Sequence, residues 1–266
     1  MNGNICLKRQ KGTTMWQAEK AARFADLHQK GNPLVLYNIW DAGGAKALAD
    51  QGASAVATGS WSVAAAQGYD DGEAIPMGFV LSIVERICAT VDVPLTVDFE
   101  GGYAPSPTEV AENVRNVIRA GAVGINFEDR IVKGEGLHPI PTQAARIRAI
   151  KAAADEEGVP LYLNARTDMF LGTDPATHEY SLTEALEREA AYAEAGADCF
   201  FVPGLTETAL IARVVETARL PINVMMMGDL SAIKGVAALG VSRASYGPRP
   251  FLQHLANLKK AYADLQ

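Results

Sequence analysis

The chain has 266 residues, of which 48% are hydrophobic, and its formal net charge is −7. This length allows one large domain or two small ones, with enough apolar residues for a sizeable core. The acidic balance argues against nucleic-acid binding, which needs a basic stripe, and no apolar run approaches the ~18 residues of a membrane span. The three cysteines, Cys6, Cys88 and Cys199, follow no disulfide or metal spacing, so we expect a cytoplasmic protein.

The first element that the sequence predicts is a helix over residues 15–29, whose apolar spacing fits an outer or end-capping helix. The polar residues before it, 1–14, are expected to be disordered or extended. A strand over 34–39 follows, and Asp41 stands where the N-cap of the next helix, 42–51, belongs. A catalytic role for Asp41 is the alternative.

From this strand onward one unit repeats. Some strands begin after a proline, at Pro33, Pro94, Pro160 and Pro221, and the others begin after a helix-ending glycine, at Gly52, Gly121, Gly196 and Gly240. Helical stretches separate the strands, among them 107–120, 142–157, 182–195 and 207–218. The candidate strands are short and apolar, as in a parallel sheet buried on both faces, and lie at 34–39, 54–59, 95–99, 123–128, 160–165, 198–202, 221–226 and 241–246.

Eight such units predict an α/β fold of the (β/α)8 TIM-barrel type. We expect a single domain over residues 15–266, with an N-terminal and a C-terminal helix added to the barrel, because nothing in the sequence resembles a linker. A doubly wound sheet is the alternative, although it rarely needs eight such even repeats.

Carboxylates end two of the predicted strands. Asp98 and Glu100 follow one apolar run, and Glu128 and Asp129 follow the next. In a barrel the chemistry belongs at the C-terminal ends of the strands, so these groups are expected to surround one pocket. A ring of carboxylates repels itself unless it holds a cation, and hard oxygen ligands suit Mg²⁺ or Mn²⁺. N-caps and solvated loop residues are the alternative interpretation.

Other polar residues fall at the same predicted edge. Gly59 and Ser60 precede a helix, where converging backbone N–H groups could seat a carboxylate or phosphate, although a simple tight turn explains them equally well. Asp70 and Asp71 follow on the same loop. Arg166 ends the fifth strand and could bind an anionic substrate, neutralise nearby carboxylates, or do both. Asn223 ends the seventh strand and is expected to bind the substrate.

The segment 130–140, R-I-V-K-G-E-G-L-H-P-I, joins the fourth strand to its helix. Its glycines make it flexible, and Lys133, Glu135 and His138 give it reactive side chains, which predicts a mobile lid. An exposed loop with incidental charges is the alternative. The sequence has no GxGxxG after a strand and no Walker A loop.

These motifs together resemble the isocitrate lyase / phosphoenolpyruvate mutase superfamily over almost the whole chain, from residue 33 to about residue 251. The most specific ones are N-I-W-D-A-G at 38–43, G-Y-D-D-G-E at 68–73, V-D-F-E-G-G-Y at 97–103, G-I-N-F-E-D at 124–129 and N-A-R-T-D at 164–168. The resemblance implies a barrel that binds Mg²⁺ and a 2-oxo acid or its enolate. It also implies a homodimer or homotetramer formed by exchange of a C-terminal helix.

The resemblance also implies roles for individual residues. Asp98 is similar to the direct metal ligand, and Asp71, Glu100 and Glu128 to the groups that hold metal-bound waters. Ser60 and Trp61, with Ser62 beside them, fall where the substrate carboxylate is seated, and Arg166 resembles the substrate-binding arginine. Lys133, Glu135 or His138 would move a proton once the lid closes. The K-[KR]-C-G-H loop motif of the true lyases is absent: here the loop reads K-G-E-G-L-H.

We therefore expect an Mg²⁺-dependent enzyme, a carbon–carbon lyase or a phosphonomutase-like enzyme, that acts on a 2-oxo acid or enolpyruvate-type substrate through a metal-stabilised enolate. A methylisocitrate- or alkylmalate-type lyase is one alternative. A barrel that binds an oxo acid without turnover is the other, because the loop cysteine is missing. No nucleic-acid or membrane partner is expected.

Overall fold

The computed structural model describes residues 13–266, so most of the predicted extended segment 1–14 lies outside the described residues. Eight parallel strands form the sheet, in the order β1-β8-β7-β6-β5-β4-β3-β2. The strands are β1 (Leu34–Leu36), β2 (Val56–Ala57), β3 (Leu95–Asp98), β4 (Gly124–Glu128), β5 (Tyr162–Arg166), β6 (Cys199–Phe201), β7 (Ile222–Met225) and β8 (Arg243–Ser245).

The sheet closes on itself. β1 pairs with β8, and Leu34 lies opposite Arg243 in this pairing. A parallel bridge between Ile39 and Thr58 joins the segment after β1 to the segment after β2. Two backbone hydrogen bonds hold this seam: Ile39 N donates to Ala57 O at 2.8 Å, and Gly59 N donates to Ile39 O at 3.2 Å. The (β/α)8 barrel predicted from the sequence is therefore confirmed, and the doubly wound sheet is excluded.

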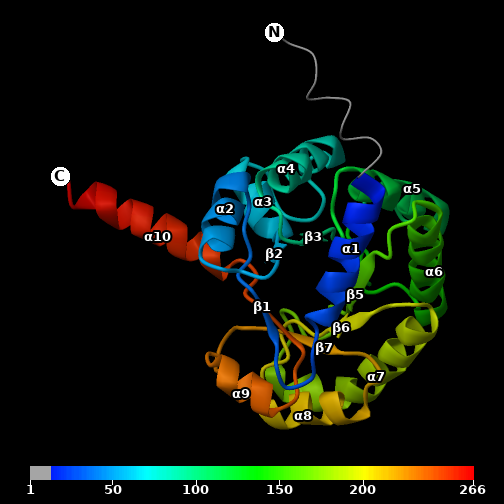
Figure 1. Ribbon diagram of the computed structural model, residues 1–266. Helices are drawn as coiled ribbons and strands as arrows, with labels where there is room; N and C mark the ends of the chain where they lie inside the picture. The colour runs from blue at the N-terminus through cyan, green and yellow to red at the C-terminus, as the bar shows by residue number, and fades with distance from the viewer. Residues whose placement is uncertain (1–12) are drawn as a thin grey trace.

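Helices surround the barrel (Figure 1). Their positions agree with the predicted ones, except that the stretch between β2 and β3 forms two helices. Among the described helices none is long and apolar enough to cross a membrane. The helices are α1 (Thr13–Asp26), α2 (Ala42–Asp50), α3 (Ser60–Ala66), α4 (Met77–Thr90), α5 (Pro107–Arg119), α6 (Ile140–Glu156), α7 (His178–Glu194), α8 (Thr208–Thr217), α9 (Ile233–Ala238) and α10 (Arg249–Ala263), with the short 3-10 helix η1 at Pro175–Thr177.

Local chemistry explains where several helices start and stop. Asp41 is an N-cap, as predicted, because its Oδ1 accepts a hydrogen bond of 2.7 Å from Gly44 N. The helix-ending glycines all adopt the left-handed conformation that glycine reaches at little cost. Their φ angles are 88° at Gly52, 107° at Gly121, 100° at Gly196 and 86° at Gly240.

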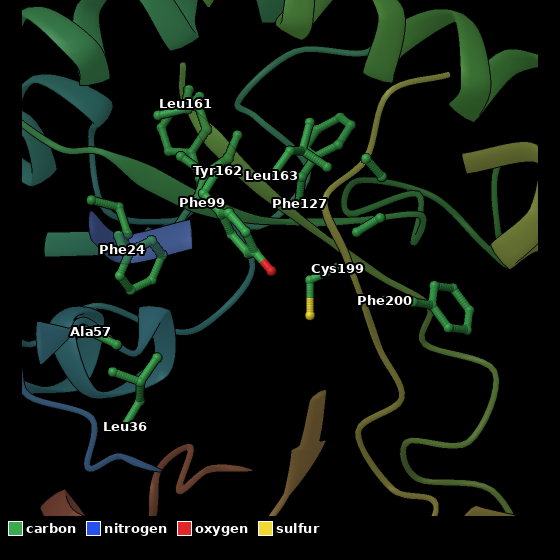
Figure 2. Packing of buried hydrophobic residues seen from close by; sticks show 14 of the residues in the cluster. Phe24, Leu36, Ala57, Phe99, Phe127, Leu161, Tyr162, Leu163, Cys199 and Phe200 are labelled. Atoms are coloured by element: carbon green, nitrogen blue, oxygen red, sulfur yellow. The ribbon is translucent and has the colours of Figure 1, made fainter. Parts of the chain in front are cut away.

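The apolar core lies between the outer face of the sheet and the helices. Phe99, Phe127 and Phe200 are fully buried there (Figure 2). α1 caps the N-terminal end of the barrel, because its Phe24 packs edge-on against Tyr162 at the start of β5, with ring centroids 5.4 Å apart. This arrangement leaves the opposite end, where the strands finish, for the site.

Candidate active site

A cavity of about 170 Å³ lies at the C-terminal ends of the strands. Six of the predicted site residues line it: Ser60, Trp61, Ser62, Asp71, Asp98 and Arg166. The other six do not: Glu100, Glu128, Lys133, Glu135, His138 and Asn223. The parallel register explains this grouping, because side chains that follow different strands meet at one edge of the sheet.

Asp98, at the end of β3, is the most firmly held carboxylate of the cavity. Its Oδ2 accepts hydrogen bonds from both the backbone N–H and the hydroxyl of Ser60, at 2.9 and 2.8 Å. Its Oδ1 lies 3.4 Å from the amide nitrogen of Asn126, which pairs with Asp98 in the β3–β4 register. The predicted carboxylate seat at Ser60 therefore holds a carboxylate of the protein itself.

Two further carboxylates lie close to Asp98. Asp71 lines the same cavity from the loop after α3, and Glu100 lines a small neighbouring cavity that shares Ser60 and Asp98. Burial raises the pKa of Glu100 to about 8, and the charges of Asp98 and Asp71 add to the effect. Removal of its carboxyl from water, followed by the charge of Asp98, also raises the pKa of Asp71. The carboxylates therefore repel one another, which favours a bound proton or cation.

Glu128 and Arg166 form a buried ion pair across β4 and β5. They are register partners, and Arg166 Nη1 lies 3.1 Å from Glu128 Oε2. On its other side Arg166 Nη2 donates to Asp168 Oδ2 at 2.9 Å. Burial lowers the pKa of Arg166, but Glu128 and Asp168 outweigh it, so the net pKa is raised. Arg166 thus both neutralises carboxylates and lines the cavity, as the sequence allowed.

The predicted lid segment folds as a tight loop beside the barrel mouth. A bridge between Arg130 and Leu137 closes it, and Ile131 N donates to Gly136 O at 3.0 Å. Lys133 and His138 line a different cavity, of about 290 Å³. Lys133 Nζ lies 3.8 Å from Glu73 Oε2, and Glu135 is exposed.

A layer of polar side chains fills the barrel interior beneath the cavity. Asn126 Oδ1 accepts hydrogen bonds from Asn164 Nδ2 at 2.7 Å and from Arg243 Nη2 at 3.0 Å. Asn223, predicted as a substrate ligand, is fully buried in this layer, where its Oδ1 accepts a hydrogen bond of 3.2 Å from the hydroxyl of Ser245. Its structural place is therefore below the cavity.

Several lining residues did not stand out in the sequence. Asn126 and Ser245 contribute polar groups, and their signal was a polar residue inside an apolar strand. Leu171, Phe201, Pro203 and Met225 contribute an apolar wall. Pro203 follows a predicted strand end, but no local pattern marks the other three as site residues, because apolar side chains near strand ends usually belong to the core.

The donor set suits a divalent cation of the hard class. Within residues 13–266 no three His, Cys, Asp or Glu side chains converge closely enough to hold a metal by themselves. Mg²⁺, however, keeps several waters and commonly takes only one or two carboxylates from the protein. Asp98 fits that chemistry, because Asp71 and Glu100 lie close enough for the charge of Asp98 to raise the pKa of both.

The chain matches a protein-family model. The model described as phosphoenolpyruvate phosphomutase matches residues 24–266, almost the whole chain. The chain is 32% identical over 244 residues to an uncharacterized protein of Mycobacterium tuberculosis (strain H37Rv), covering 91% of this chain and 89% of that one. It is also 32% identical over 199 residues to the 2-methylisocitrate lyase of Escherichia coli (strain K12), covering 73% of this chain and 65% of the lyase.

Solved structures share the fold. A "putative phosphonomutase" from Burkholderia cenocepacia J2315 is similar with a TM-score of 0.91 and 45% identity, covering 94% of this chain and 100% of that one. A phosphonopyruvate hydrolase, solved with oxalate and Mg²⁺, matches with a TM-score of 0.82 over 92% of this chain and 86% of that one. At 21% identity the latter likeness concerns the fold alone.

Proposed function

Because the chain belongs to the phosphoenolpyruvate phosphomutase family, we propose that it is an Mg²⁺-dependent lyase or mutase of this superfamily. Its substrate would be a 2-oxo acid or an enolpyruvate-type acid, in which a C–C or P–C bond is cleaved or rearranged through an enolate. One observation carries the proposal: Asp71, Asp98, Ser60 and Arg166, which come from three separate parts of the chain, line one cavity at the ends of the strands.

Asp98 would hold the metal, with Asp71 and Glu100 acting through bound water. The mutual repulsion of these carboxylates supports this assignment, because a cation would relieve it. When bound, Mg²⁺ would supply the positive charge that polarises a 2-oxo group. Mn²⁺ has similar ligand preferences and is expected to substitute.

The protein's own groups would hold and orient the anion. Ser60 fixes Asp98 through two hydrogen bonds, so the carboxylate is positioned before any ligand arrives. Arg166 is the basic side chain among the lining residues, and Glu128 and Asp168 restrain its guanidinium. Such a restrained planar fork suits a substrate carboxylate.

The proton donor or acceptor is proposed to come from the 130–138 loop. His138 lies at the base of this loop, where its backbone N–H donates to Asp129 O at 2.7 Å. Burial and the nearby Arg146 lower the pKa of its imidazole, which favours the neutral form that can act as a base. Lys133 and Glu135 would need the loop to move toward the 170 Å³ cavity.

A second candidate is a barrel that binds an oxo acid without turnover. The absence of the lyase cysteine from the loop favours it, and so does the position of the loop outside the lining of the cavity. The carboxylates of the cavity argue against a pocket that has decayed altogether, because such a pocket would be expected to have lost groups that repel one another.

The two candidates are separated by measuring binding and turnover side by side. Oxalate and pyruvate would be titrated calorimetrically with Mg²⁺. Turnover would be assayed on oxaloacetate, phosphonopyruvate, 2-methylisocitrate, 2,3-dimethylmalate and the monocarboxylate 4-hydroxy-2-oxopentanoate. Asp98→Ala should abolish both signals, while Asp92→Ala, an exposed carboxylate outside the cavity, should change neither. Full activity in Asp98→Ala would refute the metal role, and binding without turnover would favour the second candidate.

We also propose that the protein forms a homodimer or homotetramer through α10. This helix extends away from the barrel (Figure 1), and its exposed apolar residues include Leu258 at 59% and Tyr262 at 67%. On the barrel, Val35 and Tyr37 of the first βα unit are each 41% exposed, although helices usually cover the outer face of a barrel strand. A second copy's α10 would bury both surfaces.

Light scattering after size-exclusion chromatography tests this assembly. Leu258→Glu, on the apolar side of α10, should shift the protein toward the monomer mass. Asn257→Glu, at the neighbouring exposed position, is the matched control and should not. A monomer at all concentrations in the unmodified protein would contradict the proposal.

A further inference from the structure

A second cavity, of about 290 Å³, lies between the 130–138 loop and the segment after β3. Its lining includes Arg130, Lys133 and His138 from the loop, Tyr103 from the segment after β3, and Arg146 from α6. None of the described residues that line it also lines the 170 Å³ cavity. The two cavities are therefore separate in this structure, and a ligand of one does not have to occupy the other.

Arg146 is a buried cation whose hydrogen-bond partners are neutral. The residue is 1% exposed, and its guanidinium lies over the ring of Phe127, 4.7 Å from the centroid. Nη1 donates to Gln143 Oε1 at 2.6 Å, and Nη2 donates to Ala104 O at 2.9 Å and to Gly101 O. Nε has no partner among the described residues. A buried charge is stabilised by a counter-charge, and the cavity beside Arg146 has room for one.

The cavity carries more positive than negative charge. Arg130, Lys133 and Arg146 are cationic, and Glu73 is the one carboxylate among the described residues that line it. Glu73 is already engaged: its Oε1 accepts a backbone N–H at 2.7 Å, and its Oε2 lies 3.8 Å from Lys133 Nζ, beyond hydrogen-bond distance. Burial, with the charge of Arg146, lowers the pKa of His138, so its imidazole adds a polar group and no charge at neutral pH. Two positive charges are left for a ligand.

We propose that this cavity is a second anion site, which binds a small dianion, either phosphate or a phosphomonoester, or a dicarboxylate. Guanidinium groups bind the paired oxygens of such anions, and Ile131 and Val132 give the cavity the apolar lining that small-molecule sites usually have. Its volume is close to the lower end of the range of about 300–1,000 Å³ for ligand pockets. The site therefore suits a small ligand.

The bound dianion also ties the 130–138 loop to the barrel, because Arg130 and Lys133 belong to the loop and Arg146 belongs to α6. In the proposed function this loop has to move toward the 170 Å³ cavity before Lys133 or Glu135 can transfer a proton. A ligand that holds the loop in its present position therefore slows turnover. This consequence rests on the proposed function, whereas the binding of the dianion does not.

Calorimetric titration of the full chain with phosphate and with succinate, in buffer freed of metal by a chelating resin, tests the binding by itself. At least one of the two should bind at millimolar concentration or below, and acetate, with a single charge, should bind at least tenfold more weakly. Tighter binding of phosphate identifies a phosphorylated ligand, and tighter binding of succinate identifies a dicarboxylate. No binding of either dianion, or equal binding of acetate, overturns the inference.

Substitutions locate the bound dianion. Arg130→Gln and Lys133→Gln, both at exposed positions, should each weaken its binding at least fivefold. Arg148→Gln, at an exposed position of α6 outside the cavity, is the matched control and should not. Unchanged affinity in both loop variants, with melting curves that show them folded, contradicts the site.

Oxalate with Mg²⁺, which the proposed function assigns to the 170 Å³ cavity, separates the two levels. It should not displace the dianion, and displacement would place the dianion in that cavity and overturn the inference. If oxalate and Mg²⁺ do not bind at all, the proposed function fails, while dianion binding that depends on Arg130 still supports the second site.

Limited trypsin digestion tests the effect on the loop. Trypsin cleaves after lysine and arginine, and Lys133 is exposed. Saturation with the tighter-binding dianion should slow cleavage after Lys133 at least fivefold in the wild type. The same concentration should give no protection in Arg130→Gln, which keeps Lys133 as a cleavage site. Unchanged cleavage of the saturated wild type would show that the dianion does not hold the loop.

Discussion

Glu100 connects the electrostatics of the site to the stability of the fold. Its side chain is buried, and the residue is only 5% exposed. Its Oε2 accepts one hydrogen bond, of 2.9 Å, from Glu73 N. Burial, with the charges of Asp98 and Asp71, raises its pKa from 4.5 to about 8. The metal-free protein should therefore become less stable as the pH rises from 4.5 to about 8, where the unfolded chain has lost this proton and the folded protein keeps it.

The sign and size follow from proton linkage. Between pH 4.5 and about pH 8 the folded state holds a proton on Glu100 that the unfolded chain has lost, so the free energy of unfolding falls as the pH rises. At about 1.4 kcal/mol per pH unit, the difference corresponds to about 5 kcal/mol across that window. Glu100→Gln keeps an oxygen to accept the Glu73 N–H and cannot ionise, so its stability should lack this decline.

Urea denaturation in a chelating buffer, at pH 5, 6.5 and 8, measures the effect. The double difference between wild type and Glu100→Gln should reach about 3.5 kcal/mol between pH 5 and pH 8, and Mg²⁺ should restore much of the wild-type loss. Glu187→Gln makes the same change at an exposed position and should run parallel to the wild type. Parallel curves for Glu100→Gln as well would show that Glu100 does not carry a raised pKa.

Two further substitutions test the scaffold. Gly204→Ala would place a Cβ 2.3 Å from Phe170 O at a φ of 90° and should lower the free energy of unfolding by more than about 3 kcal/mol. Gly172→Ala, at a φ of 75° with open space around the new Cβ, should lower it by about 1 kcal/mol. Equal losses of stability in thermal or urea unfolding would contradict the steric argument. Arg243→Met removes a buried guanidinium whose Nη1 has no partner, so the free energy of unfolding should equal that of the wild type or exceed it by about 1 kcal/mol. The same variant should weaken Mn²⁺ binding at least fivefold by calorimetry, because Asn126 loses a restraint; a large loss of stability with unchanged affinity would refute this.

The barrel could be predicted because the residues that mark its strand starts lie next to those strands in the sequence. A proline or a helix-ending glycine marks each strand start, and each of the four glycines has the positive φ that its position requires. The seam between β1 and β2 could not be predicted, because it consists of a single bridge that depends on how far the sheet curves. The division of the stretch after β2 into α3 and α4 is likewise set by packing on the barrel.

The site could be predicted only in part, for a related reason. Strand ends identify which residues reach the mouth, and that placed Asp98 and Arg166 at the cavity. They do not show which of these side chains are already hydrogen-bonded to other groups of the protein. Ser60 binds Asp98, and Asn223 is buried under Ser245. Such contacts join strands far apart in the sequence, so no local pattern contains them.

The end of β4 illustrates why adjacent carboxylates need separate explanations. Successive side chains of a strand point to opposite faces, so Glu128 faces the barrel interior and pairs with Arg166. Asp129 is instead held on the α7 side, where it accepts a hydrogen bond of 2.9 Å from the hydroxyl of Tyr192 and lies 3.2 Å from Arg188 Nη1. Asp129 Oδ1 also accepts the N–H of Asp168 at 3.0 Å.

This second carboxylate therefore stabilises the site without entering it. By fixing the backbone at Asp168, Asp129 places the carboxylate that restrains Arg166. Of these two neighbours, Glu128 thus contributes to the charge balance of the cavity, and Asp129 helps to hold Arg166 in place. A barrel can hold several mutually repelling carboxylates near one mouth because alternation along each strand sends some of them outward, where helix side chains neutralise them.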